Sequence, residues 1–509
     1  MPDLLAAHGA AHPAKLAVID DRPGRPVVAW SFAELDRRAN QLAHLLVDLG
    51  ADASTKVVWC GQNSAGLVAA FHAIRKAGAI GVPLNYRLSP DEAAYVVDNS
   101  DAEVVVVDTE HVGLIERARH GAPRVTSVVV FGADGELEGG RGAGLPITAP
   151  DVPESSIDRA ATMIYTSGTT GKPKGALRRF SPDRGQVAGL LGLIGYVPND
   201  VYLTTGPLYH SGPGGFAVIA HVLGNTIVVQ HKFDPEDWLR LVDTYRVTTT
   251  FTAPTPIRMV CNLPSEVKAR YDRSSMVRLV GNAAPWTLAL KRRYMEDFPP
   301  GSLWEVYGST ELGVDTVLGP GDHLRKPGSC GLPAPGIEIK LFDEDGREVT
   351  EAFTPGELYV RSATMFEVYY KAEDMYEADR RGDFHTVGDI AYRDEEGFYY
   401  IADRKSDMII SGGMNIYPAE IEAALDACPG VYEVAVFGIP DEDWGERVHA
   451  VVVPARADLV PAEVETFARA HLAGYKVPRS VSFTDELPKT GSGKVLKREL
   501  RAPYWVASH

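Results

Sequence analysis

Residues 165–175 combine the side chains best suited to binding phosphate. They read Tyr-Thr-Ser-Gly-Thr-Thr-Gly-Lys-Pro-Lys-Gly. Glycine lets backbone N–H groups approach an anion closely, hydroxyls add donors, and lysine adds positive charge. The Gly-x-x-x-x-Gly-Lys-Ser/Thr spacing of a Walker loop is absent. The apolar run at residues 160–165 predicts a buried strand that ends at this loop. The candidate phosphate contacts are Thr166, Ser167, Gly168, Thr169, Thr170, Gly171 and Lys174.

This loop resembles, nearly letter for letter, the signature of the adenylate-forming superfamily of acyl-CoA synthetases, luciferases and nonribosomal adenylation domains. The resemblance runs in order over residues 32–500, which is nearly the whole chain. It implies that a carboxylate attacks the α-phosphate of ATP to form acyl-AMP, from which AMP can then depart. Such an enzyme must neutralise the triphosphate, hold adenine and ribose, and bring two anions together.

A second motif, Tyr-Gly-Ser-Thr-Glu at residues 307–311, resembles the family's Tyr-Gly-x-Thr-Glu. The resemblance implies that Tyr307 stacks on adenine, Thr310 contacts the α-phosphate and Glu311 ligates Mg²⁺. A carboxylate combined with substrate phosphates is how proteins usually hold Mg²⁺. Thr310 and Glu311 are therefore candidate catalytic residues.

Two further segments resemble the parts of the family that hold the nucleoside. Thr-Val-Gly-Asp at residues 386–389 departs from the usual Thr-Gly-Asp by one inserted valine. It implies that Asp389 accepts hydrogen bonds from both ribose hydroxyls, with Arg404 as the matching ribose and phosphate contact. Residues 281–285 resemble a segment whose backbone lines adenine and the acyl group, although a plain strand-to-turn connection stays an alternative. Its candidate contacts are Asn282, Ala283 and Ala284.

The C-terminal part resembles the family's mobile domain. In residues 487–500, Lys494 matches the lysine that reaches the active site, on a loop made flexible by glycines. Residues 411–422 resemble the segment that lines the pantetheine tunnel after this domain rotates. Its candidate contacts are Ser411, Gly412 and Gly413. In this family the small domain takes one arrangement for adenylation and another for thioester formation. The residue about which it pivots is usually Asp or Lys and is Ser406 here, so it stays open whether a charge pair favours either arrangement.

The acyl pocket is implied by family position at residues 207–216 and 251–256, with Gly281 and Val314. Glycines and apolar side chains predict a roomy apolar pocket. His210 matches an aromatic position near the carboxylate, and a satisfied core histidine is the alternative. After the phosphate loop, Arg178 and Arg179 replace the usual His-containing continuation, and their role stays open.

The elements that must position these residues alternate between strand and helix. Ser31 opens a capping box for a helix that closes at Gly50, and continuous valines at residues 104–107 predict a strand covered on both faces. From about residue 340 the pattern is β-rich, with hairpin turns at 343–346 and 394–397. Past Asp403, helices at 418–427 and 462–472 flank strands at 432–438 and 449–453.

The expected fold class is therefore α/β, with two domains. Residues 1–403 would form an AMP-binding N-terminal domain of helix-flanked sheets plus a β-barrel-like subdomain. Residues 404–509 would form the small mobile α/β domain that carries the catalytic lysine and the CoA-tunnel segment.

The composition limits the classes of partner that this protein can bind. A chain of 509 residues with 45% hydrophobic and 23% charged residues can bury a sizeable core. A net charge of −17 argues against nucleic acid and anionic membranes, so ATP must be attracted by local positive groups. The four cysteines have neither metal-ligand spacing nor a disulfide framework. No run reaches membrane-spanning length and no signal peptide is evident, so we expect a cytoplasmic monomer or homodimer.

The sequence thus predicts an AMP-forming acyl-CoA synthetase that uses ATP, Mg²⁺ and CoA with a fatty or other bulky hydrophobic acid. An aryl-CoA ligase for a benzoate- or cinnamate-type acid would share every core motif. A stand-alone carrier-protein-loading enzyme is less favoured, because residues 207–216 lack an amine-anchoring Asp and no carrier domain follows. A light-producing oxidative enzyme would need a distinct substrate. A catalytically silent nucleotide-sensing or scaffold protein is another alternative. The presence of Lys494, Glu311 and Asp389 argues against it, because a silent homologue would not need them.

Overall fold

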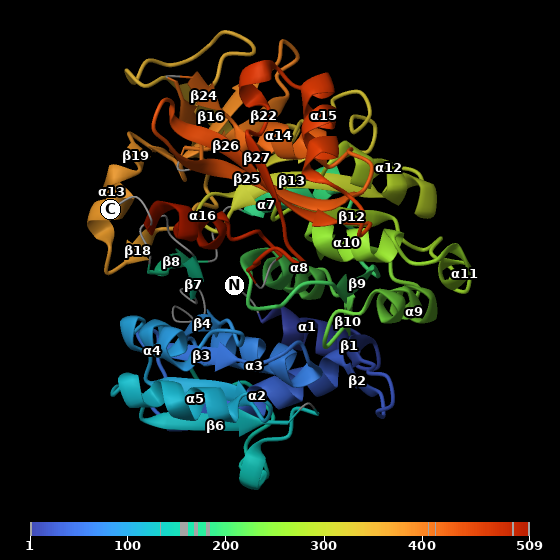
Figure 1. Cartoon of the computed structure of the whole chain (residues 1–509). Coiled ribbons are helices and arrows are strands. Elements are labelled where there is room, and N and C mark those ends of the chain that lie inside the picture. The colour runs from blue at the N-terminus through green and yellow to red at the C-terminus, as the bar shows by residue number, and fades with distance from the viewer. Residues whose placement is uncertain are drawn as a thin grey trace.

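A computed structural model describes residues 3–132, 134–152, 161–166, 172–179, 184–405, 407–412, 414–490 and 493–506. Within these residues the strands form four sheets (Figure 1). The loop residues Ser167, Gly168, Thr169, Thr170 and Gly171, the pivot Ser406 and the tunnel residue Gly413 lie outside the described residues.

The first sheet carries the phosphate loop at its edge. Its strand order is β18-β8-β7-β4-β3-β5-β6. The five strands β7, β4, β3, β5 and β6 run parallel to one another. β8 is antiparallel to both β7 and β18. The strands are β3 (Lys56–Cys60), β4 (Ile80–Leu84), β5 (Val104–Asp108), β6 (Ser127–Phe131), β7 (Ala161–Thr166), β8 (Lys174–Arg179) and β18 (Val368–Tyr370).

Helices cover both faces of this sheet, as the continuous valines of β5 predict. Val104 and Val106 pack with α2 (Phe32–Asp48) and α3 (Ala65–Lys76). Val105 and Val107 pack on the opposite face with α4 (Pro90–Asn99) and α5 (Val112–Ala118). Ser31 caps α2 as predicted, since its Oγ accepts from Glu34 N at 3.2 Å, but the reciprocal bond of the predicted capping box is not formed. A complete capping box begins α4 at Ser89.

The second sheet has the order β15-β14-β13-β12-β11-β9-β10-β1-β2. Its strands are β1 (Leu16–Asp20), β2 (Val28–Ser31), β9 (Val201–Thr204), β10 (Thr226–Val229), β11 (Thr249–Thr252), β12 (Arg278–Gly281), β13 (Leu303–Ser309), β14 (Gly313–Leu318) and β15 (Leu332–Pro333). Its helices are α1 (Leu4–Ala11), α7 (Arg184–Ile194), α8 (Ser211–Val222), α9 (Pro235–Tyr245), α10 (Pro254–Cys261), α11 (Ser265–Lys268) and α12 (Leu288–Asp297).

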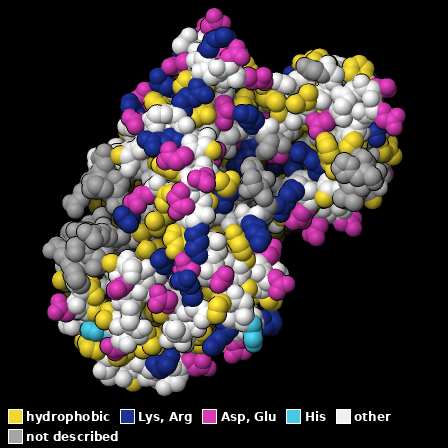
Figure 2. Space-filling view, turned by 90° about the vertical axis from the view of Figure 1, so that its left-hand side faces the viewer, with side chains coloured by type: hydrophobic (Ala, Val, Ile, Leu, Met, Phe, Trp, Pro, Cys, Tyr) yellow, Lys and Arg dark blue, Asp and Glu magenta, His cyan; other side chains and the backbone are white. Residues whose placement is uncertain are grey.

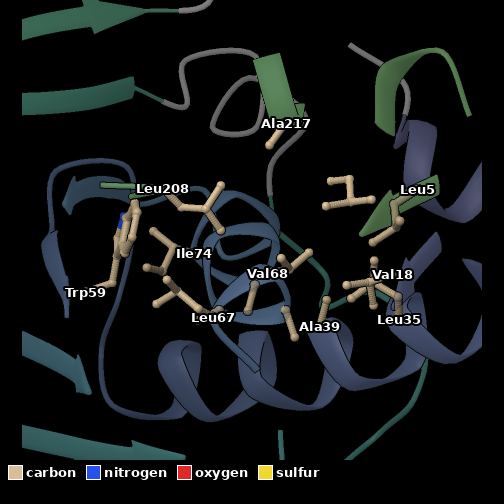
Figure 3. Packing of buried hydrophobic residues seen from close by; sticks show 14 of the residues in the cluster. Leu5, Val18, Leu35, Ala39, Trp59, Leu67, Val68, Ile74, Leu208 and Ala217 are labelled. Atoms are coloured by element: carbon tan, nitrogen blue, oxygen red, sulfur yellow. The ribbon is translucent and has the colours of Figure 1, made fainter. Parts of the chain in front are cut away.

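One hydrophobic core joins the first two sheets. Leu67 and Val68 of α3 pack toward Leu208 and toward Ala217 of α8, while Leu35 of α2 lies near Val18 of β1 (Figure 3). Because β9, β11, β12 and β13 are parallel, their carboxyl ends meet at one edge of the second sheet. Ligands of open α/β sheets bind at such edges.

The third sheet is antiparallel and follows the predicted β-rich region. Both predicted hairpin turns are present, with Gly346 and Gly397 at φ values of +80° and +84°. The sheet consists of β16 (Glu338–Phe342), β17 (Gly356–Arg361), β19 (Arg380–Arg381), β20 (Phe384–His385), β21 (Asp389–Arg393) and β22 (Tyr399–Arg404), with α13 (Glu373–Ala378) beside it.

The fourth sheet begins after β22 and has its own hydrophobic core. It contains β23 (Ile409–Ser411), β24 (Met414–Ile416), β25 (Val431–Asp441), β26 (Gly445–Pro454) and β27 (Ser480–Phe483), with α14 (Pro418–Leu425), α15 (Pro461–His471) and α16 (Lys497–Val506). β25 and β26 are longer than predicted, because their polar ends stay paired as one hairpin up to Asp441 and Gly445. Among the described residues, no helix is long and apolar enough to cross a bilayer.

Candidate active site

The hairpin of β13 and β14 carries Thr310 and Glu311 to the base of the phosphate loop. Thr166 Oγ1 donates to Glu311 Oε1 at 2.8 Å, and the Tyr369 hydroxyl donates to the same oxygen at 3.2 Å. The hydroxyls of Ser211 and Thr310 lie 2.8 Å apart. Thus β7, β18, the start of α8 and the hairpin turn meet around one buried carboxylate.

The two ends of the phosphate loop are held together by strand pairing. Thr166 on β7 pairs with Lys174 on β8. The Lys174 ammonium lies 5.2 Å from the ring centroid of Tyr369, which also contacts Glu311. On the face that Figure 2 shows, Lys and Arg side chains gather beside the hollow between the lobes. At the phosphate loop itself, Lys174 adds positive charge beside Thr166 and Tyr369.

A second cluster links the carboxyl edge of the second sheet to the third sheet. The Tyr307 hydroxyl donates to Asp389 Oδ2 at 2.5 Å, and Arg404 Nε lies 3.3 Å from Asp389 Oδ1. Asp389 and Arg404 are register partners on β21 and β22. Burial, and then Asp389, raise the pKa of Tyr307 well above its ordinary value, so its hydroxyl keeps its proton. The inserted Val387 packs against the core of the third sheet, which leaves Asp389 in register.

Asn282, Ala283 and Ala284 lie at the same edge, directly after β12. Asn282 Nδ2 donates to the Val306 carbonyl at 2.6 Å, one residue before Tyr307. Ala283 has a φ of +74°, an uncommon left-handed conformation for a residue with a side chain. Such strain at the end of a parallel strand is frequent where a backbone lines a ligand.

Lys494 lies with the second cluster. Burial, and then Arg404, lower its pKa to about 8, while Asp389 and Asp407 oppose the shift. Lys494 N donates to Thr490 Oγ1 at 3.1 Å, which closes the loop that carries it. A Cβ atom placed on the preceding Gly493 would lie 3.6 Å from Thr255 Oγ1, so this loop touches the start of α10.

Ser411 and Gly412 are not brought to this site. Ser411 pairs with Gly445, and Gly412 N donates to the Trp444 carbonyl at 2.8 Å. Figure 1 places β24, which follows them, at the top of the molecule and away from β7 and β8. Beside them, the half-exposed Trp444 indole has the Arg479 guanidinium 4.6 Å from its ring centroid.

His210 precedes α8 and is not a satisfied core histidine. Its Nε2 atom is buried without a hydrogen-bond partner among the described residues. Burial, and then Arg87, lower its pKa to about 4, so the ring is neutral at pH 7. A buried polar atom without a partner is costly, and a ligand would relieve that cost.

Aromatic rings lie beside two of the glycines in the implied acyl pocket. A Cβ atom on Gly212 would lie 2.4 Å from the Phe251 ring, and one on Gly281 would lie 2.6 Å from the Trp286 ring. Phe251 also stacks on Phe216 at 4.8 Å. Aromatic rings therefore occupy space that the two glycines leave.

Sequence reasoning missed Tyr369 as a neighbour of the site, and it placed Ser211 only within the acyl-pocket segment 207–216. Tyr369 follows the phosphate loop by a long stretch of chain, and no motif marks it. Among the described residues, no group of three or more His, Cys, Asp or Glu side chains could hold a metal ion alone. A metal at this site would therefore need phosphate oxygens beside the single carboxylate of Glu311, which suits Mg²⁺ bound with a nucleotide.

Comparison with known proteins agrees with this geometry. The profile of the AMP-binding enzyme family matches residues 5–370, and that of the AMP-binding enzyme C-terminal domain matches residues 420–494. The chain belongs to the AMP-binding enzyme family. It is an AMP-forming acid–CoA ligase, with ATP, Mg²⁺ and CoA as co-substrates.

Its relatives act on different acids. The chain is 35% identical to a feruloyl-CoA synthase of Amycolatopsis sp, over 93% of this chain and 94% of that protein. It is 32% identical to a long-chain-fatty-acid–CoA ligase of Mycobacterium tuberculosis, over 94% and 93%. The crystal structure of ATP-bound MatB from Rhodopseudomonas palustris superposes with a TM-score of 0.86 at 29% identity, covering 99% of this chain and 98% of that one. The predicted fold class is confirmed.

Proposed function

We propose that this AMP-binding enzyme activates a fatty or other bulky hydrophobic acid as acyl-AMP and transfers the acyl group to CoA. The observation that carries the proposal is the convergence of Lys494, Asp389 and Arg404 at the edge where Tyr307 and the Glu311 turn lie. Such a site can hold a nucleotide and neutralise the charge that develops during adenylation.

Each group has a proposed task. Thr166, Lys174 and the intervening loop bind the β- and γ-phosphates, and Thr310 donates to the α-phosphate. Glu311 holds Mg²⁺, which neutralises phosphate charge when bound. The Tyr307 ring stacks on adenine, and Asp389 accepts the ribose hydroxyls.

The acid is oriented by contacts near the α-phosphate. Neutral His210 offers its unpartnered Nε2 beside the acid carboxylate. Lys494, when protonated, draws the carboxylate and the α-phosphate together. Attack by the carboxylate then forms the acyl–phosphate bond, and pyrophosphate leaves.

We further propose that residues 1–403 and 404–509 act as two domains that change arrangement between the half-reactions. Lys494 lies at the site whereas Ser411 and Gly412 lie away from it, which fits the adenylating arrangement. Rotation would exchange the two segments and bring the Trp444–Arg479 surface, both aromatic and cationic, toward CoA. A cytoplasmic location and a monomeric or homodimeric state stay predictions.

A planar aromatic acid is the second candidate. The stacked rings of Phe216 and Phe251 favour it, because aromatic rings pack well against another planar ring. The feruloyl-CoA synthase relative also supports it.

One assay tests the function and separates the acids. Pyrophosphate and AMP release would be measured with fatty and aryl acids, with and without CoA. We expect acid-dependent pyrophosphate release and CoA-dependent AMP release. Turnover that CoA does not support would favour carrier-protein loading, and no release with any acid would contradict the proposal.

A further inference from the structure

Arg178 on β8 directs its side chain at the turn that joins β13 and β14. Its Nη2 donates to the carbonyl of Thr310 at 2.7 Å and lies 3.4 Å from the carbonyl of Glu311. The side chains of these two residues contact Ser211 and Thr166 instead. The guanidinium therefore braces the backbone of the turn whose side chains form the site.

A buried carboxylate lies in the same hairpin. Tyr307 pairs with Thr316 and Gly308 with Val314, so Asp315 is the extra residue of a β-bulge. Its side chain is fully buried, and neither carboxylate oxygen has a hydrogen-bond partner among the described residues. Burial, and then Asp389, raise the pKa of Asp315, and the charge of Arg178 opposes that shift.

Gly313 lies in contact with the guanidinium, and its backbone conformation favours glycine. It has a φ of +98°, and a Cβ atom placed on it would lie 3.9 Å from Arg178 Nη1 and 3.0 Å from Thr364 Oγ1. Arg178 thus meets the turn at Thr310, at Glu311 and at Gly313. A planar guanidinium with several donors suits this task, whereas an ammonium could not span the turn.

We propose that Arg178 is a positioning residue that holds the Thr310–Glu311 turn in the geometry needed to bind Mg²⁺ and the phosphates. This inference rests on the proposed roles of Thr310 and Glu311. Arg178 acts through the turn and contacts no reacting atom.

The test uses Arg178→Met and a double variant that also changes Asp315. In Arg178→Met we expect about a tenfold higher Mg²⁺ concentration for half-maximal adenylation, as the loss of a charged hydrogen bond implies. In Arg178→Met/Asp315→Asn the Asp315 carboxyl group is removed as well, and neither of its oxygens bonds the guanidinium. The Mg²⁺ requirement should stay high, because the turn is still unbraced.

The adjacent arginine supplies a matched control. Arg179 is exposed, and its Nη1 lies 3.4 Å from Glu367. Arg179→Met should leave both the Tm and the Mg²⁺ requirement unchanged. Thioester formation from preformed acyl-AMP and CoA should also be nearly unaffected in every variant, because that half-reaction needs no Mg²⁺–triphosphate.

Three results would overturn the inference. Recovery of the Mg²⁺ requirement in the double variant would show that the effect of Arg178→Met came from Asp315 and not from the unbraced turn. A change confined to the KM of the acid would make Arg178 a substrate contact. If Arg178→Met folds and its Mg²⁺ requirement is unchanged, Arg178 has no positioning role.

Two further measurements keep the test decisive. If Arg178→Met does not fold, Arg178→Lys keeps a cation near Asp315 but not the span of the guanidinium, and the same Mg²⁺ shift is expected. Mg²⁺·ATP binding by calorimetry should weaken about tenfold in Arg178→Met and not in Arg179→Met. This binding test holds even if wild-type protein releases no pyrophosphate, an outcome that would count against the proposed function alone.

Discussion

Replacement of Lys494 by alanine should separate the two half-reactions. Burial lowers the pKa of Lys494 from 10.5 to about 8. Keeping Lys494 charged before the substrates bind therefore costs about 3 kcal/mol, at ~1.4 kcal/mol per pKa unit. The acid and ATP, both anionic, would offset that cost when they bind. A donor aimed at transferring oxygens in an enclosed site is worth roughly 3–4 kcal/mol. Lys494→Ala should therefore slow acyl-AMP formation by on the order of 10²–10³-fold.

Single-turnover assays would measure each half-reaction separately. Acid and ATP report adenylation, whereas preformed acyl-AMP and CoA report thioester formation, which should be largely preserved because the Lys494 loop must leave the site first. Lys489→Ala is the control, since Lys489 lies on the same segment but pairs with Glu433 at 2.7 Å. Comparable losses in both half-reactions would refute the domain alternation.

The pH dependence follows from the same group. Because burial lowers the pKa of Lys494 to about 8, its charged form is present below that pH and is lost above it. The kcat/KM of adenylation should fall as pH rises through about 8, and Lys494→Arg should remove that descending limb. Below about pH 8 the buried, charged Lys494 destabilises the fold. The free energy of unfolding should therefore rise between about pH 8 and the pKa of this lysine in the unfolded chain. A pH profile unchanged in Lys494→Arg would assign the limb to another group.

Three other substitutions test the remaining contacts. Glu311→Gln should lower metal-dependent turnover about tenfold or more, as loss of a contact of ~1.4 kcal/mol implies, and an unchanged kcat/KM would remove it from the metal site. Asp389→Ala should raise the KM for ATP at unchanged fold, since two lost hydrogen bonds cost roughly 2–5 kcal/mol; equal wild-type affinity for ATP and its 2′,3′-dideoxy analogue would contradict the ribose assignment. Arg258→Ala removes bonds to Asp426 at 2.9 Å and to the Tyr432 carbonyl at 2.7 Å. It should slow adenylation several-fold but spare thioester formation, and an equal loss in both half-reactions would show that these bonds do not favour one arrangement.

The sequence alone determined the features that depend on neighbouring residues. The continuous valines of β5 predicted a strand covered on both faces, and Ser31 marked the start of a helix. Periodicity and capping are local properties, so they survive in any fold that contains the segment. The motifs around Lys174, Glu311 and Lys494 belong to the same class, because each is contiguous in the chain.

Only the tertiary structure decided how distant segments meet. The Tyr369 hydroxyl reaches Glu311, and the Phe251 ring fills the space beside Gly212, across stretches of chain that no periodicity relates. The role of Arg178 was invisible for the same reason, since its partners lie more than a hundred residues away on another sheet. These contacts depend on how two sheets pack through a shared core, and packing is set by the whole set of buried side chains rather than by any one segment.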